Sequence, residues 1–125
     1  MIRDHKLWTW HIATGILILV LLGLHMAIMH LDALLGIFNP AGGHPIDWQN
    51  VAARSQSLFF TVTYVLLLGA ALFHGLYGLR NILFELDPAA PLKRSISWVL
   101  ILVGLGLLVV GSWAAWLSFQ NTLVA

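Results

Sequence analysis

The chain has 125 residues, of which 60% are hydrophobic and only 9% are charged, against about 25% charged residues in an average soluble domain. A water-soluble domain of this size cannot hide so much apolar surface, and a disordered chain needs low hydrophobicity, so both classes are excluded. The net charge of +1 argues against nucleic-acid binding. The absence of cysteine excludes disulfides, zinc–thiolate sites and iron–sulfur clusters built by this chain. These figures predict a small integral membrane protein.

Three apolar runs, at about residues 7–31, 58–84 and 96–119, divide the chain. Each has about the 20 residues that a helix needs to cross a bilayer, and a helix satisfies its own backbone hydrogen bonds in lipid. The predicted fold class is therefore an all-α membrane protein with three transmembrane helices. Residues 1–125 are expected to form a single membrane-anchor domain.

Two polar segments separate the predicted helices. The first contains a turn cluster with two prolines and two glycines at residues 39–45, and this whole segment is expected to be loop. The second contains Pro88 and Pro91, which are expected to end the second helix. Ser95 or Ser97 is the expected N-cap of the third helix.

Basic residues are distributed unevenly over these segments. Most of them precede the first span or surround the second loop, and only one lies in the first loop. The larger group is Arg3, Lys6, Arg80, Lys93 and Arg94, and the remaining residue is Arg54. Because Lys and Arg are enriched in cytoplasmic loops, the N-terminus is predicted to be cytoplasmic and the C-terminus outside. The expected location is a prokaryotic cytoplasmic (inner) membrane.

Two of the six histidines, His25 and His74, lie deep inside predicted spans, where an ionisable residue is a functional candidate by default. With a helical rise of about 1.5 Å per residue, they differ in height by about 10 Å. Two imidazoles on one iron need their nitrogens about 4 Å apart, because each metal–nitrogen bond is about 2 Å long. His25 and His74 are therefore expected to serve separate metal centres, each completed by another chain's ligand. The alternative is that each bonds a neighbouring carbonyl without metal.

One helical stripe beside His74 carries further chemistry. Gly78 and Asn81 recur at helical spacing from His74, and Arg80 flanks them. A glycine lets a flat macrocycle lie against the backbone, and Arg and Asn donate hydrogen bonds to carboxylates such as haem propionates. The stripe indicates a haem site at these four residues, with helix packing at Gly78 and snorkelling of Arg80 as alternatives.

Segments 14–25 and 74–85 together resemble the cytochrome b membrane-anchor subunits of succinate dehydrogenase and fumarate reductase, of the two-haem type. The two patterns are Thr14-Gly15-x9-His25 and His74-x3-Gly78-x-Arg80-x4-Glu85. Aspartate is commoner in the family at the position of the final glutamate. The resemblance covers the first two predicted spans, because the third is too generic to add weight.

The resemblance implies that the chain belongs to a succinate:quinone oxidoreductase, the respiratory complex II of the tricarboxylic acid cycle. It implies a non-catalytic electron-transfer subunit that packs with a second anchor subunit into a haem-binding bundle. The implied partners are that anchor, an iron–sulfur subunit and a flavoprotein subunit, and only these partners hold FAD and iron–sulfur clusters. Two haem b groups are implied, with His74 on the haem nearer the cytoplasm and His25 on the distal haem. Electrons would pass between the clusters and membrane quinone.

The resemblance leaves the quinone site open. One-haem anchors carry Ser and Arg near the start of helix one, and this chain has Trp8 and Ile12 there, so those roles do not transfer. The quinone candidates are Trp8 and His11 near the inner edge, and His30 for an outer site, each with a structural or interfacial role as the alternative. Three other hypotheses remain: a one-haem anchor, a haem-free structural anchor, and a haem b subunit of another respiratory dehydrogenase.

Overall fold

The computed structural model describes residues 2–35 and 42–121, which form helices joined by short turns, without a strand. The helices are, in chain order, α1 (Ile2–Leu35), α2 (Trp48–Ser55), α3 (Leu58–Glu85) and α4 (Ala90–Asn121). Within the described residues, three helical segments are long and apolar enough to cross a membrane, namely His5–Leu31, Leu58–Glu85 and Ala90–Gln120. The all-α class and the three predicted spans are confirmed, and the chain fits a multi-pass integral membrane protein.

The distribution of apolar side chains supports a lipid environment. Large apolar side chains on all three long helices point outward, as at Leu19 and Val110, which are 74% and 67% exposed. The buried apolar residues of the described chain are few: Ile28, Phe60 and Ala70. In water this much exposed apolar surface would be very costly, whereas lipid tails solvate it.

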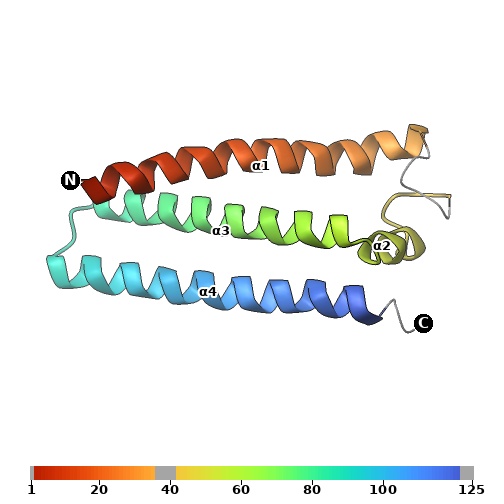
Figure 1. Ribbon diagram of the computed structural model, residues 1–125. Helices are drawn as coiled ribbons and strands as arrows, with labels where there is room; N and C mark the ends of the chain where they lie inside the picture. Colours follow the sequence, from red (N-terminus) through yellow and green to blue (C-terminus); the bar gives the residue numbers. More distant parts are fainter. Residues whose placement is uncertain (1, 36–41, 122–125) are drawn as a thin grey trace.

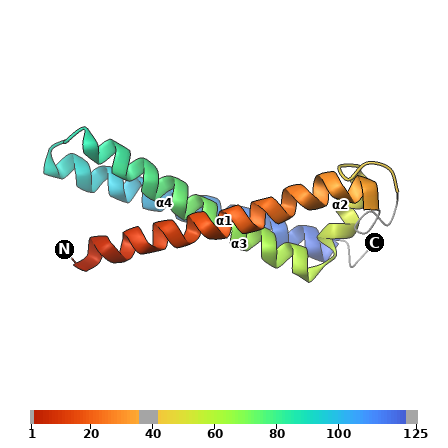
Figure 2. The ribbon, with the colours of Figure 1, turned by 90° about the horizontal axis from the view of Figure 1, so that it is seen from above.

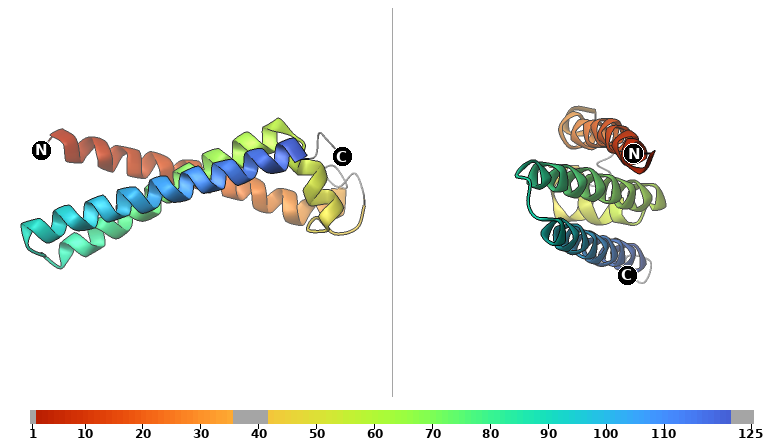
Figure 3. Two further views of the ribbon diagram at one scale, coloured as in Figure 1. Left: turned by 90° about the horizontal axis from the view of Figure 1, so that it is seen from below. Right: turned by 90° about the vertical axis from the view of Figure 1, so that its left-hand side faces the viewer.

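The three long helices lie in a row, with α3 between α1 and α4 (Figure 1). α3 packs against both neighbours, whereas α1 and α4 do not pack against each other. α3 and α4 run antiparallel and nearly aligned, but α1 crosses α3 obliquely (Figures 2 and 3). The result is an open layer with two uncovered faces, and this layer positions the side chains described below.

The two ends of the layer differ in charge. The start of α1 and the α3–α4 turn lie at one end, and α2 and the end of α4 lie at the other (Figure 1). Lys6, Lys93 and Arg94 belong to the first end, and Arg54 belongs to the second. The start of α1 and the α3–α4 turn therefore share the end of the layer that carries most of these basic residues.

The third long helix begins at Ala90, earlier than the sequence predicts, so the predicted N-cap at Ser95 or Ser97 is wrong. Pro91 lies in the first turn of α4, where a missing N–H costs no helical hydrogen bond. Both serines lie inside the helix, and their hydroxyls donate to the carbonyls of Pro91 and Lys93 at 3.2 and 2.9 Å. α3 does end before Pro88, as predicted, whereas Pro91 lies in the first turn of the next helix.

A short helix, α2, occupies part of the first segment, which was predicted to be loop throughout. Asn50 is fully buried, and its amide Nδ2 donates to the carbonyls of Gly42 at 2.9 Å and His44 at 3.0 Å. The buried Arg54 donates to the carbonyl of Pro45. These hydrogen bonds join α2 to the turn that precedes it. Hydropathy does not reveal such contacts, so the sequence did not predict the helix.

The turn cluster predicted at residues 39–45 is described from Gly42 onward, and residues 39–41 lie outside the described residues. Gly42 and Gly43 have φ values of +70° and +75°. Glycine adopts this left-handed region without the steric cost that other residues meet. The predicted turn is confirmed for this part of the cluster.

Candidate functional site

The central feature of the α1–α3 crossing is a pair of stacked imidazoles. His74 of α3 lies against His11 of α1, with ring centroids 4.0 Å apart and ring planes 9° from parallel. The Nδ1 atom of His74 lies 3.0 Å from the backbone carbonyl oxygen of His11. With its proton on Nδ1, His74 donates a hydrogen bond to this carbonyl. The orientation of the His74 ring is therefore set by the backbone of the neighbouring helix.

Glycines lie opposite both histidines and permit the close approach. A Cβ atom at Gly15 would lie 3.0 Å from Cε1 and 3.3 Å from Nδ1 of His74. A Cβ atom at Gly78 would lie 3.4 Å from Cε1 of His11. Each helix thus presents a glycine to the other helix's histidine, which explains why Gly15 and Gly78 are spaced four residues from His11 and His74. The face of Gly78 is covered by the chain's own His11.

His11 retains one unsatisfied polar atom. Its Nδ1 is buried and forms no hydrogen bond with any described residue. The ring of Tyr77 lies beside it, with centroids 5.3 Å apart and planes tilted by 53°. Buried polar atoms are nearly always hydrogen-bonded, so an unpaired one is a point of interest. His11 is the quinone candidate that the structure brings into contact with His74.

The geometry of His74 bears on metal ligation. A metal-bound histidine commonly donates its other ring N–H to a carbonyl or carboxylate, and His74 has this arrangement at Nδ1, with Nε2 left to carry the lone pair. Stacked rings present their faces to each other, so His11 and His74 do not aim their nitrogens at one iron from opposite sides. The described residues contain no cluster of three or more His, Cys, Asp or Glu side chains suited to a metal ion.

His25 occupies a different environment, near the other end of the α1–α3 contact. Its ring meets that of Tyr64 edge-on, with centroids 5.8 Å apart and planes at 77°. A small cavity of about 10 Å³ lies beside it, lined in part by Ile28 and Phe60. Ten residues separate His25 from Gly15 on α1, which corresponds to about 15 Å along the helix. The structure therefore keeps His25 and His74 at different levels, as expected.

Arg80 contacts α4, and Asn81 contacts Arg80. The Nε of Arg80 donates to the hydroxyl of Ser97 in α4 at 3.2 Å, and one guanidinium nitrogen donates to Asn81 Oδ1 at 3.4 Å. The guanidinium carbon also lies 4.2 Å from the centroid of the Phe84 ring. Arg80 therefore belongs to the α3–α4 side of the layer, whereas His74 faces α1. The structure does not bring these two predicted site residues together.

The two remaining quinone candidates lie apart from the histidine pair. Trp8 is 60% exposed on α1, one turn from His11 toward the start of the helix. His30 is exposed near the opposite end of α1. Neither has a hydrogen bond to another described residue that would place it in a site.

Sequence reasoning missed three partners of the site residues. Tyr77 follows His74 by three residues and so shares its face, which is a helical-spacing signal that was available. Tyr64 and Ser97 gave no such signal, because their pairing with His25 and Arg80 depends on how neighbouring helices are rotated. Comparison of the chain with protein-family models, curated proteins and solved structures finds no match.

Proposed function

We propose that the chain is a haem b-containing membrane anchor of a succinate:quinone oxidoreductase. It docks the soluble subunits at the membrane and passes electrons between their iron–sulfur clusters and quinone. The observation that carries the proposal is the His74 imidazole, whose Nδ1 lies 3.0 Å from a backbone carbonyl. This is the arrangement expected of a haem-ligating histidine, and it occurs in the segment that resembles the family.

In this proposal His74 and His25 would each hold the iron of a separate haem. The partner anchor subunit supplies the second ligand of each, since the described residues offer no opposing histidine in line with either. Bound haem b supplies one-electron transfer, and its potential depends on burial and on hydrogen bonds to its ligands. The His11 carbonyl holds the proton of His74 on Nδ1 and so leaves Nε2 unprotonated.

The contacts of the crossing assign supporting roles to its other residues. Gly15 and Gly78 let α1 and α3 approach closely enough for the hydrogen bond to form. Quinone is proposed to bind toward the end of the layer that holds Trp8 and His11, with His30 as the candidate for an outer site. One open face of the three-helix layer is the proposed surface for the second anchor.

The test is the haem b content of the complex, purified through a tag on this chain together with its associated subunits. A reduced-minus-oxidised spectrum and a pyridine haemochrome assay are expected to give two haems per complex. His74→Ala and His25→Ala are each expected to remove one haem. The matched control is His5→Ala, because His5 is exposed at the start of α1.

Other outcomes separate the competing hypotheses. One haem that depends on His74 alone indicates a one-haem anchor, and the absence of haem from the wild-type complex contradicts the proposal. Absence of haem would then mean that His74 and His25 only make the contacts within this chain that are described above. Succinate-dependent reduction of a quinone analogue distinguishes this complex from one with another dehydrogenase.

A further inference from the structure

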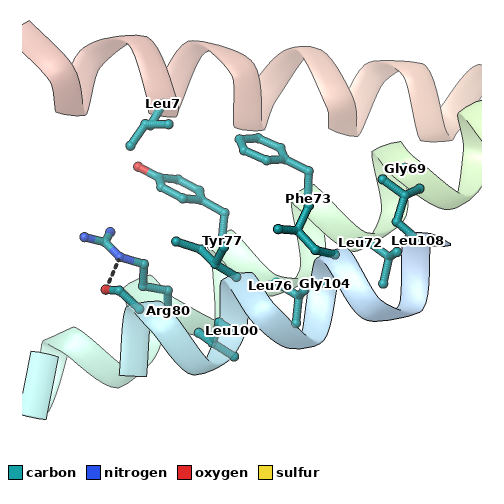
Figure 4. A pocket seen from close by; sticks show the side chains of 13 residues that line it. Leu7, Gly69, Leu72, Phe73, Leu76, Tyr77, Arg80, Leu100, Gly104 and Leu108 are labelled. Carbon is teal, nitrogen blue, oxygen red and sulfur yellow. Dashed lines mark hydrogen bonds between the residues drawn. The ribbon is translucent and has the colours of Figure 1, made fainter. Parts of the chain in front are cut away.

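An apolar groove of about 500 Å³ runs along α3, between α1 and α4 (Figure 4). Leu7 of α1 borders one side, α3 residues such as Leu72 and Leu76 form the floor, and α4 residues such as Leu100 and Leu108 form the other side. The groove exists because α1 diverges from α4 and the two helices do not pack together. None of the proposed haem ligands lines it.

The groove continues into a basic recess at the charged end of the layer. This recess has a volume of about 340 Å³, and it shares Arg80, Ser97 and Ile101 with the groove. Its lining also includes Lys93 and Arg94, so three cationic side chains surround one opening. The apolar groove therefore ends in a positively charged recess.

The cationic side chains of the basic recess are only partly neutralised. The ammonium group of Lys93 lies 2.7 Å from Asp87 Oδ1. Arg80 is held by the neutral hydroxyl of Ser97, and Arg94 forms no ion pair with any described residue. Glu85 is exposed at the end of α3 and does not line the recess. The single carboxylate of Asp87 beside three cations leaves the basic recess with a net positive charge.

We propose that this composite cavity binds an anionic phospholipid. The headgroup phosphate lies among Arg80, Lys93 and Arg94, and an acyl chain lies in the apolar groove along α3 and α4. Basic pockets between transmembrane helices at the cytoplasmic side suit such headgroups, and the adjoining Trp98 has the character of an interfacial residue. The continuity of charge and apolar groove favours a phospholipid over free phosphate, and the cations favour it over an apolar partner helix.

The test is native mass spectrometry of the full-length chain with its co-purifying subunits, stripped of lipid and titrated with phosphatidylglycerol or phosphatidylcholine. Phosphatidylglycerol is expected to bind more tightly. Arg94→Gln is expected to weaken its binding about fivefold, as is typical for one basic residue near an anionic lipid. The variant should fold, because Arg94 is exposed. Lys6→Gln is the matched control, since Lys6 is exposed at the same end but does not line the cavity.

The length of the lipid's acyl chains tests the apolar groove independently of the basic recess. Dihexanoyl-phosphatidylglycerol is expected to bind more weakly than the dioleoyl form, because it buries less apolar surface. Equal binding of the two lipid headgroups, or equal losses in Arg94→Gln and Lys6→Gln, overturns the proposal. So does competition by inorganic phosphate that removes long-chain lipid completely, or a complex whose groove takes up no lipid because a partner helix fills it.

Discussion

His74 and His25 are the same residue type on facing helices, yet the fold treats them differently. His74 is bonded to a backbone carbonyl, stacked on a second imidazole and opposed by a glycine. His25 is held by an edge-on contact with Tyr64 and lies beside a small cavity. Among the described residues, the orientation of His74 is therefore set by a backbone carbonyl, and that of His25 by side-chain packing. The comparison predicts that the two sites respond differently to substitution of their neighbours.

The largest effect is expected from Gly15→Leu. Its Cβ would lie 3.0 Å from His74 Cε1, so the leucine must displace either the ring or the whole of α1. Overpacking of this kind typically costs about 1–3 kcal/mol. We expect a loss of that size in the unfolding free energy of the detergent-solubilised protein, together with loss of the haem that we propose His74 binds.

Gly23→Leu is the matched control for that experiment, because nothing lies within 4 Å of a Cβ at Gly23. It places the same side chain on the same helix without touching either histidine. Similar destabilisation by the two variants would mean that leucine perturbs α1 generally. The contact between Gly15 and His74 would then not explain the effect of Gly15→Leu.

A smaller effect is expected from Tyr64→Leu, which removes the edge-on partner of His25. Aromatic pairs of this geometry contribute about 0.5–1.5 kcal/mol beyond the area that they bury. The unfolding free energy should fall by about this amount, and Tyr64→Phe should retain most of the stability because the contact is made by the ring. A double-mutant cycle with His25→Ala measures the coupling directly, and a coupling of zero would contradict the pairing.

The smallest effect is expected from Asp87→Asn, in the α3–α4 turn far from His25. The hydrogen bond from Lys93, and then its charge, hold the pKa of the Asp87 carboxyl below its ordinary value. A lowered pKa in the folded protein means that the carboxylate stabilises the fold above its unfolded pKa of about 3.9. This contribution is lost as the pH falls through the folded pKa.

Thermal unfolding in detergent at several pH values checks this prediction. Asp87→Asn should be slightly less stable than the wild type at neutral pH, and the two should converge in acid. Asparagine tolerates the left-handed backbone at this position, where φ is 47°, so the variant isolates the charge. A difference that persists unchanged at low pH would exclude the ion pair as its source.

The sequence predicted the three spans well and their connections poorly. Hydropathy locates a span because every residue of a lipid-exposed helix contributes to the same signal. The start of α4 and the presence of α2 depend instead on single contacts, such as the position of Pro91 in a first turn and the buried amide of Asn50. Such contacts are local, polar and few, so they leave no periodic pattern.

The candidate site was likewise predicted only in part from the sequence. The sequence by itself determined a membrane protein of three helices, with His25 and His74 at separate depths, because length, hydropathy and helical rise are properties of single segments. Only the tertiary structure decided that His74 meets His11, that Gly78 faces that ring, and that Arg80 turns toward Ser97. These pairings depend on the rotation and crossing of one helix against another. That geometry arises from side-chain packing across the interface, which no single segment encodes.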